Sequence, residues 1–463
     1  MIFSSKAEYG VRLMVELGRQ SPEHPTSLKA IADAEGLPLA YLEQVVARLR
    51  KAGLVMSARG AHGGYWLARP AEEIAVVAER AAATGRLGID TEFMSEGRYR
   101  PLLCLAQVVV DGTDTDDPQI ALIDTLRGDP DPRPLAALLA DPYVEVIVHA
   151  GRQDVAILRR AWASDVRNVF DTQIAAGFAG ASAQAGYGNL LGAMLGRRVG
   201  KTASYTRWDA RPLTPEQLHY AAEDVAHLLE LADEIQRRLS ESSRLEWARE
   251  ECRRLESATE ERDPESAWER LPRVRQLDPR SRAVARAVAA WRERTAASED
   301  RPVGSVLADP TLVEIAKRHP ADLERLAQIR GMHRSVVRRR GPSILESIKL
   351  GLADPPIPRE RAREHAESAD VPLIVLAEAL LRARALEAGL AYELIASRAE
   401  LELIVGAARR SDPEPQVRTL TGWREQLVGR DLRDLLAGRS TLSVGQGRRL
   451  TLKPASGGAD DRR

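Results

Sequence analysis

The sequence is poor in cysteine and in aromatic residues. Its 463 residues include two cysteines, Cys104 and Cys252, and aromatic side chains make up 4% of the chain. Two thiols are too few for a disulfide framework or for a metal site built from several cysteines. The shortage of aromatic residues, beside abundant alanine, leucine and arginine, predicts more helix than strand.

An excess of charge of one sign is also absent. The chain carries 67 Lys and Arg against 67 Asp and Glu, so any surface that binds a polyanion must be local. No apolar run approaches 18 residues, and the N-terminus lacks the basic-then-apolar pattern of a signal peptide. We therefore expect a cytoplasmic protein that makes no contact with membranes.

The length predicts three or four domains, at roughly 100–200 residues per domain. Changes in composition along the chain divide it into successive segments. We expect a helix-turn-helix block at 1–73, an α/β domain at 74–240, a helical linker at 241–279, a helical domain at 280–352, a second helical domain at 353–445 and a disordered tail at 446–463.

The segment from 74 to 240 combines strands with helices. Short apolar runs separated by Asp, Gly and Pro predict strands at 87–89, 102–110, 120–123 and 144–148. Helical periodicity returns from about residue 152. Strands followed by helices indicate an α/β domain.

Five side chains in this domain are candidates for catalysis. Asp90 and Glu92 end a short apolar strand, and the period of two places both on one face. Asp154 lies in the first turn of the helix after the fourth predicted strand, and Tyr220 and Asp224 share one helix face at i and i+4. Any one of these acids alone could simply cap a helix or lie on a solvated face.

Taken together, the four carboxylates and the tyrosine resemble the DEDD exonuclease superfamily, in its tyrosine-bearing subclass, and within it the ribonuclease D family. The connecting segments 100–107, 170–176 and 208–213 are similar to that family's motifs. The resemblance implies a ribonuclease H-like α/β exonuclease domain. It also implies hydrolysis at RNA 3′ ends that releases nucleoside 5′-monophosphates.

The resemblance further implies two divalent cations, Mg²⁺ or Mn²⁺, because hard cations prefer carboxylate oxygen. Asp90 would bridge both cations, with Glu92 and Asp224 completing the one that activates water. Asp154 would support the cation on the leaving-group side. Tyr220 would orient the attacking water, since an unperturbed pKa near 10 makes it a poor free base.

Other residues of this domain are candidates for contact with nucleic acid. Phe93 could stack on a base, although packing into the core is an equal alternative. Lys201, Arg207 and Arg211 could meet phosphates.

One departure from the family concerns the start of this domain. Its members usually carry an extra strand and a short helix before the strand with the two acids, whereas only residues 74–85 stand there in this chain. The extra strand is therefore missing or is supplied by the N-terminal block.

Residues 1–73 resemble the winged-helix regulators typified by the iron–sulfur cluster repressor. Helices at 30–35 and 39–51 with a turn between them predict a helix-turn-helix, and the Gly-rich segment 59–68 would be the wing. The match stops before the dimerisation helix of those regulators. Because no cysteine precedes Cys104, we expect no iron–sulfur cluster, and weak DNA contact rather than sequence-specific repression.

Residues 280–352 resemble the HRDC domain, and 353–445 resemble a second, degenerate copy. Between 280 and 349 there are 15 basic and 8 acidic residues, a local net charge of +7 that favours a phosphate backbone. The densest part of this charge is Arg334, Arg338, Arg339 and Arg340.

The sequence thus predicts a monomeric, metal-dependent 3′→5′ exoribonuclease that trims RNA with a single-stranded 3′ end, with transfer RNA precursors as substrates. Three alternatives stay open. The chain could be a DNA-binding transcription regulator with a secondary or inactive exonuclease domain, or an exonuclease that acts on DNA. A binding-only protein with an inactive fold is the third, against which the intact set of acids argues.

Overall fold

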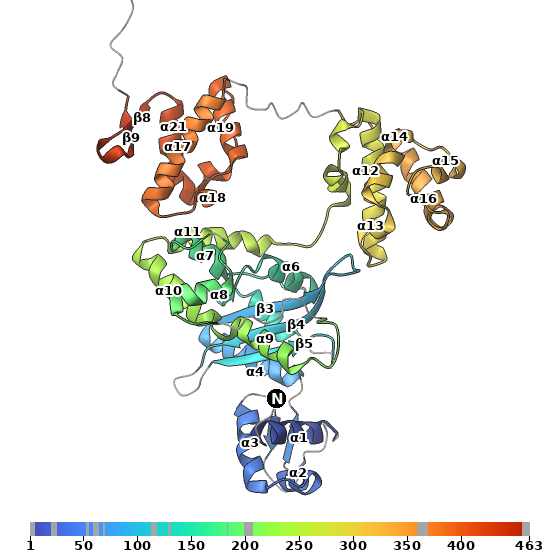
Figure 1. Cartoon of the computed structure of the whole chain (residues 1–463), viewed down its shortest axis with the longest axis vertical. Helices are drawn as coiled ribbons and strands as arrows, with labels where there is room; N and C mark the ends of the chain where they lie inside the picture. The colour runs from blue at the N-terminus through green and yellow to red at the C-terminus, as the bar shows by residue number, and fades with distance from the viewer. Residues whose placement is uncertain are drawn as a thin grey trace, which may run out of the picture. The chain divides into compact units, whose positions relative to one another are not determined.

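The structure is a computed structural model that describes most of the chain (Figure 1). The described residues are 5–19, 26–51, 55–58, 64–67, 70–112, 118–127, 131–182, 184–198, 207–358 and 369–455. They form two compact units, one made of Met1–Phe93 and Leu103–Thr259 and the other of Met94–Leu102 and Glu260–Arg463. None of the helices among these residues combines the length and the apolarity needed to cross a membrane.

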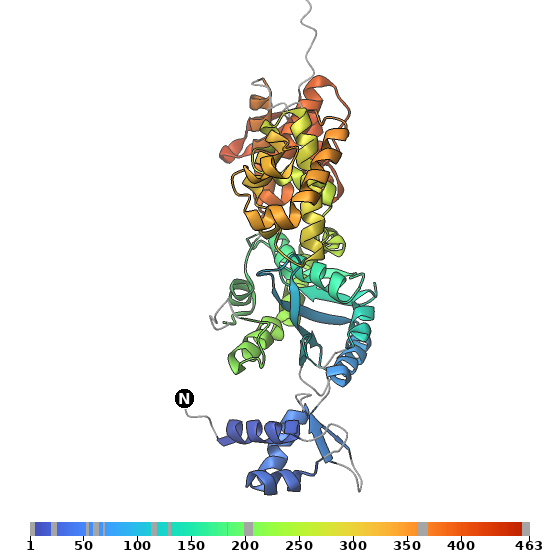
Figure 2. The same cartoon turned by 90° about the vertical axis from the view of Figure 1, so that its right-hand side faces the viewer.

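The N-terminal region contains the predicted helix-turn-helix. Its elements are α1 (Ser5–Arg19), α2 (Leu28–Glu35), α3 (Leu39–Lys51) and a hairpin of β1 (Val55–Ala58) and β2 (Gly64–Leu67), visible in blue in Figure 2. The Ser27 hydroxyl caps α2 by accepting from the Ala30 amide, and Gly36 ends the helix with φ 62°, which glycine adopts without strain. The chain turns at Gly36, and α3 then forms the second helix of the helix-turn-helix.

A five-stranded sheet, in the order β5-β4-β3-β6-β7, forms the core of the α/β domain. Its strands are β3 (Arg86–Met94), β4 (Leu102–Val110), β5 (Gln119–Asp124), β6 (Glu145–Val148) and β7 (Val169–Asp171). β3 lies in the centre and pairs in parallel with β6, which pairs in parallel with β7, while β4 and β5 are antiparallel. The four predicted strands are confirmed, and the short β7 is the one that sequence analysis missed.

Helices precede and follow the strands of this sheet. They are α4 (Pro70–Thr84), α5 (Arg133–Leu139), α6 (Arg152–Ala161), α7 (Thr172–Phe178), α8 (Tyr187–Leu190), the π-helix η1 (Leu191–Leu195), α9 (Pro215–Ala226) and α10 (Leu228–Glu241). α4 runs directly into β3 and packs on α5 and β5. Among the described residues, neither β1 nor β2 joins the five-stranded sheet, so the N-terminal block does not supply the extra strand there.

The segment 241–279, predicted as a helical linker, is helical but is divided between two cores. It forms α11 (Leu245–Cys252) and the 3₁₀ helices η2 (Arg253–Ser257), η3 (Pro264–Arg270) and η4 (Val274–Gln276). Leu255 and Ala258 are buried with the α/β core, whereas Leu271 and Leu277 are buried with the next helical core. Its apolar side chains therefore tie it to folded units, which polar composition alone did not reveal.

The second unit begins with a helical domain in which two long helices pack closely. Its helices are α12 (Pro279–Ser298), α13 (Val303–Val306), α14 (Asp309–Arg318), α15 (Leu323–Ala327) and α16 (Arg334–Ala353). A Cβ atom at Gly351 of α16 would lie 2.6 Å from the Cα of Val284 in α12. Glycine at this position therefore sets how closely the two backbones approach.

The loop Met94–Leu102 belongs to this second unit. Tyr99 is buried there, and its hydroxyl donates to Glu293 Oε1 of α12 at 3.0 Å. Asp300 accepts from the Tyr99 amide at 3.2 Å and pairs with Arg98 at 2.7 Å. The residues that follow β3 are thus fixed by side chains at and beyond the end of α12.

The C-terminal elements include a hairpin where a disordered tail was expected. They are α17 (Val371–Ala388), α18 (Tyr392–Ile395), α19 (Arg398–Arg410), η5 (Arg418–Leu420), α20 (Gly422–Arg424), the π-helix η6 (Glu425–Gly429), α21 (Arg430–Leu436), β8 (Ser440–Val444), η7 (Gln446–Arg448) and β9 (Leu450–Pro454). Residues 446–455 are therefore ordered, because Leu452 pairs with Leu442 and Leu450 pairs with Val444 across the hairpin. Residues 456–463 lie outside the described part of the chain.

We expect Gly351→Ala to lower the free energy of unfolding by about 1–3 kcal/mol, because the new methyl group meets backbone atoms that cannot rotate away. Urea denaturation of the full chain measures this change. Gly304→Ala in α13 is the matched control, since nothing lies within 4 Å of its Cβ position. Equal stability of the two variants would contradict the close packing of α12 and α16.

Candidate active site

The strand β3 carries two of the predicted acids on one face. A Cβ atom at Gly88 would lie 2.6 Å from Val109 Cγ1 of β4 and 3.1 Å from Leu228 Cδ2 of α10. Because side chains alternate along a strand, Asp90 and Glu92 share this face with Gly88. The two acids therefore lie on the side of the sheet that α10 covers.

Asp154 reaches the site from the first turn of α6. Its carboxylate is buried and accepts a short hydrogen bond from the Thr91 hydroxyl of β3. The turn between β6 and α6 is tight, because a Cβ atom at Gly151 would lie 2.5 Å from Val148 Cβ. This glycine allows α6 to begin immediately after the strand and so places Asp154 beside β3.

Asp171 holds that turn in place. At the end of β7 it caps α7, accepting from the amides of Gln173 at 2.8 Å and Ile174 at 3.1 Å. The same carboxylate accepts from the amides of Gly151 at 2.8 Å and Ala150 at 3.2 Å. One buried side chain thus fixes the start of two helices, one of which carries Asp154.

Tyr220 and Asp224 come from α9. The helix starts with a capping box in which Thr214 and Gln217 satisfy each other's backbone amides. The Tyr220 hydroxyl hydrogen-bonds to Asp224, one helical turn away. The ring of the buried Trp208 lies 6.1 Å from the Tyr220 ring, centroid to centroid, and limits its movement.

Burial disfavours ionisation of all four carboxylates, and neighbouring acids add to this effect at Asp90 and Glu92. Burial, followed by the charges of Asp154, Asp224 and Glu92, raises the pKa of Asp90 well above its usual value. Burial and the charges of Asp224 and Asp154 raise the pKa of Glu92 to about 8. Burial also raises the pKa of Asp154, and it raises that of Asp224 to about 6. The structure therefore brings the four predicted acids into one electrostatically coupled group.

The chemistry of this group fits divalent cations. Among the described residues, no lysine or arginine forms an ion pair with Asp90, Glu92, Asp154 or Asp224, so their negative charge has no counter-charge within that part of the chain. Carboxylate oxygens are the ligands that Mg²⁺ and Mn²⁺ prefer. As the side chains stand, no three His, Cys, Asp or Glu in the described part of the chain are gathered as a ready ligand set. Binding would therefore require small rotations of these carboxylates.

Sequence profiles of three known families match the chain. A 3′-5′ exonuclease profile matches residues 67–240, and an HRDC domain profile matches residues 281–348. A profile described as an iron-dependent transcriptional regulator matches residues 3–87. The exonuclease match includes all five predicted catalytic residues.

Full-length relatives are also similar to the chain. Ribonuclease D of Gluconacetobacter diazotrophicus is 36% identical over 388 residues, which cover 83% of this chain and 95% of the relative. The chain belongs to the ribonuclease D family. Ribonuclease D of Granulibacter bethesdensis is 37% identical, over 81% of this chain and 93% of the relative.

A solved structure agrees with this assignment. Escherichia coli RNase D, described as an exoribonuclease involved in structured RNA processing, superimposes with a TM-score of 0.69 at 28% identity. The match covers 79% of this chain and 97% of the other. The enzyme class of the chain is accordingly that of a 3′→5′ exoribonuclease of the ribonuclease D type, with an RNase H-like domain, an N-terminal winged-helix region and an HRDC domain.

Sequence analysis missed the residues that support the ribonuclease D site. Asp171 stands in a segment that resembles the family, but its role depends on amides 20 residues away, which no local pattern reveals. Tyr187 also lies beside the acids, whose charges together with burial raise its pKa. Its hydroxyl accepts from the His227 amide at 3.2 Å.

The His149 side chain packs beside Tyr187, and we assign it no part in the reaction. Its Nδ1 is 2.9 Å from the Thr172 hydroxyl, and its ring centroid is 5.5 Å from that of Tyr187. Burial lowers the pKa of His149 to about 4. The imidazole is therefore neutral at pH 7.

The structure corrects one of the expected nucleic-acid contacts in the exonuclease domain, that of Arg211. Phe93 is partly buried and packs against the core, and its stacking on a base stays a prediction. Arg211 has 9% side-chain exposure and holds Asp124 at 2.6 Å, so its guanidinium is occupied within the fold. Arg207 is exposed and pairs with Asp209 at 2.7 Å. Lys201 lies outside the described residues.

The four arginines of the basic cluster in the HRDC domain differ in their exposure and in their ion pairs. Arg334 and Arg338 of α16 are exposed and make no ion pair with a described residue. Arg339 is exposed and lies 3.7 Å from Glu299. Arg340 is buried and pairs with Glu299 at 2.7 Å, so it is removed from our expected phosphate contacts. The spacing of arginines along the sequence did not show which one turns inward.

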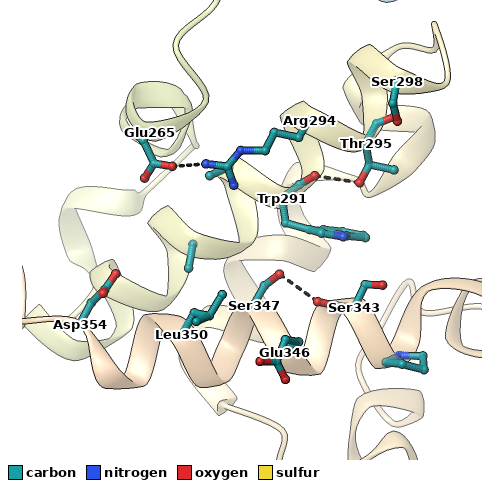
Figure 3. Close-up of a pocket in the computed structure, with 13 residues that line it drawn as sticks. Glu265, Trp291, Arg294, Thr295, Ser298, Ser343, Glu346, Ser347, Leu350 and Asp354 are labelled. Carbon is teal, nitrogen blue, oxygen red and sulfur yellow. Dashed lines mark hydrogen bonds and ion pairs between the residues drawn. The ribbon is translucent and has the colours of Figure 1, made fainter.

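A separate cavity of about 900 Å³ lies between α12 and α16 (Figure 3). Its lining includes Trp291 and three carboxylates, those of Glu265, Glu346 and Asp354. The one arginine in the lining, Arg294, is paired with Glu265. The other two carboxylates also have basic partners, since Asp354 pairs with Arg286 at 2.9 Å and Glu346 lies 3.8 Å from Lys349.

We expect Asp171→Ala to lower the free energy of unfolding by about 2–4 kcal/mol, because it removes a helix cap and leaves further buried amides without an acceptor. Urea denaturation of the full chain measures the loss. Asp322→Ala, which removes an exposed cap on α15, should cost only about 1 kcal/mol. A loss at Asp171 no larger than at Asp322 would show that Asp171 acts as an ordinary cap.

Proposed function

We propose that the chain hydrolyses RNA from its 3′ end with the help of divalent cations and releases nucleoside 5′-monophosphates. The observation that carries this proposal is the group of four carboxylates without a described counter-ion, in which the charges of Asp154 and Asp224 help to raise the pKa values of Asp90 and Glu92. Such a group is costly in a folded protein unless a cation offsets the repulsion. Membership in the ribonuclease D family supports the same reaction class.

The four carboxylates would hold the cations. When bound, a pair of divalent cations supplies a nucleophile at neutral pH and offsets negative charge on the leaving oxygen. Asp90 is central to the group, because it interacts with each of the other three acids. We propose that Asp90 would contact both cations, that Glu92 and Asp224 would help to hold the one that activates water, and that Asp154 would help to hold the other. Thr91 fixes the orientation of Asp154 through its hydroxyl.

Tyr220 would orient the attacking water. Burial and the neighbouring carboxylates raise its pKa above the usual value of 10, so the hydroxyl keeps its proton at neutral pH. A neutral tyrosine cannot act as the base, but it can hydrogen-bond to a water and to Asp224 at once. Trp208 supports the ring in that position.

The substrate class follows from the family and from local charge. We propose RNA with a single-stranded 3′ end, with transfer RNA precursors as the physiological case. The exposed Arg334 and Arg338 of α16 would contact its backbone, so binding should weaken as salt increases. We also propose that residues 353–445 form a second, degenerate HRDC-type domain.

The N-terminal region supports a weaker, second contact. Arg48 and Arg50 of α3 are exposed on the second helix of the helix-turn-helix. They could meet a DNA backbone, although binding by one such motif is weak without a second half-site. That the chain is a monomer, and the boundaries of its four domains and the helical linker, stay predictions.

We expect purified protein with Mg²⁺ or Mn²⁺ to shorten a 3′-tailed RNA hairpin in one-nucleotide steps, and EDTA to stop the reaction. Asp90→Asn should slow cleavage on the order of 10³-fold or more, since a bridging ligand is lost. Asp131→Asn, at an exposed aspartate, is the control and should cleave normally. Equal trimming of the matching DNA would instead indicate a general nuclease.

We expect Tyr220→Phe to reduce kcat about 10–100-fold while Mn²⁺ binding stays unchanged, because the hydroxyl orients water and is not a ligand. Single-turnover kinetics and Mn²⁺ titration measure the two quantities. Tyr143→Phe, at a tyrosine with 89% exposure, is the matched control. Loss of Mn²⁺ binding in Tyr220→Phe would reassign the tyrosine to the metal site.

A further inference from the structure

Gln107 of β4 has a polar side chain buried without a partner. Its side chain is fully buried, and neither Nε2 nor Oε1 makes a hydrogen bond with any described residue. Almost all buried amides in folded proteins are hydrogen-bonded, because an unpaired one loses its contacts with water and gains nothing in return. A chain that keeps such a group in its central sheet needs a reason for it.

The strand register places Gln107 beside Asp90. The close approach of Gly88 and Val109 shows that these two residues are neighbours on the same face. Residues 95–101 alone connect β3 to β4, and so short a connection requires an antiparallel pair. In such a pair, a step of two residues forward along β3 from Gly88 reaches Asp90, and a step of two residues back along β4 from Val109 reaches Gln107. Asp90 and Gln107 are therefore cross-strand neighbours, with side chains on one face.

The other neighbours of Gln107 leave its amide without a substitute partner. On β5 its partner in register is Leu122, which is apolar. Above this face lies α9, which packs on β5 and carries Tyr220 and Asp224. The unpaired amide therefore faces the same space as the four candidate acids. Its neighbour among them is Asp90, the acid that interacts with the other three.

We infer that Gln107 is a positioning residue, whose Nε2 donates a hydrogen bond to the Asp90 carboxylate when that carboxylate binds cations. In the cation-free protein, the side chain is held ready but unpaired, at a cost in stability. Binding turns Asp90 towards the donor and satisfies both groups. This inference rests on the proposed cation-dependent reaction and adds to it a residue that fixes the bridging ligand.

Gln107→Met tests the inference, because methionine has similar length and volume but no amide. Free Mn²⁺, followed by electron paramagnetic resonance during titration of the full-length protein, reports affinity independently of activity. We expect the dissociation constant for Mn²⁺ to rise about 10–100-fold, as for other residues that orient a ligand. We also expect the thermal midpoint of the cation-free protein to rise by about 2–4 °C, because the unpaired amide is gone.

Mn²⁺ affinity therefore falls while the thermal midpoint rises, and these opposite effects on binding and on stability separate positioning from packing. Val109→Ala, on the same strand and face, is the control, and it should lower the thermal midpoint without changing Mn²⁺ affinity. Gln107→Leu gives a second apolar variant if the methionine variant does not fold. An unchanged Mn²⁺ affinity in folded Gln107 variants would overturn the inference, whatever the thermal midpoint does.

The outcome for the wild-type protein distinguishes this inference from the proposed function. If the wild type fails to bind Mn²⁺, the proposed cation-dependent reaction is wrong, and the role of Gln107 falls with it. If the wild type and Gln107→Met bind Mn²⁺ equally, the reaction stands and only the role of Gln107 is wrong.

Discussion

Repulsion between buried carboxylates is the constraint on which the rest of the catalytic domain depends. Asp90, Glu92, Asp154 and Asp224 come from three different elements, and each would be more stable in water than beside the others. The fold must therefore supply enough apolar packing elsewhere to hold them together. The central sheet does this, because β4 is buried along nearly its whole length.

The supporting groups reduce that repulsion only in part, and they do so by neutral hydrogen bonds. Thr91 donates to Asp154 and Tyr220 donates to Asp224, whereas no described arginine or lysine pairs with any of the four acids. A basic partner would stabilise the empty site but would compete with a cation for the same oxygens. Neutral donors fix the geometry and leave the charge available for binding.

The sequence identified the candidate acids and the tyrosine more readily than the residues that surround them, and the catalytic roles of the five stay a prediction. Acids at fixed spacing on one strand and one helix can be recognised locally, as with Asp90, Glu92, Tyr220 and Asp224. Asp171 and Gln107 could not be recognised in this way, because their roles depend on contacts between strands and turns that are far apart in the chain. The same limit explains Arg211, whose partner Asp124 is 87 residues away, and Arg340, which turns inward to Glu299.

The loop after the catalytic strand has a consequence for how the chain can be divided. The α/β unit ends within β3 at Phe93, and six residues later the loop is buried at Tyr99 by partners on and near α12. A fragment ending before residue 260 would keep every catalytic side chain yet expose Tyr99 and leave its hydroxyl, Arg98 and two loop amides without Glu293 and Asp300. The chain therefore cannot be truncated between its exonuclease domain and its C-terminal helical domains without removing the partners of this loop, although the sequence around residue 260 is polar.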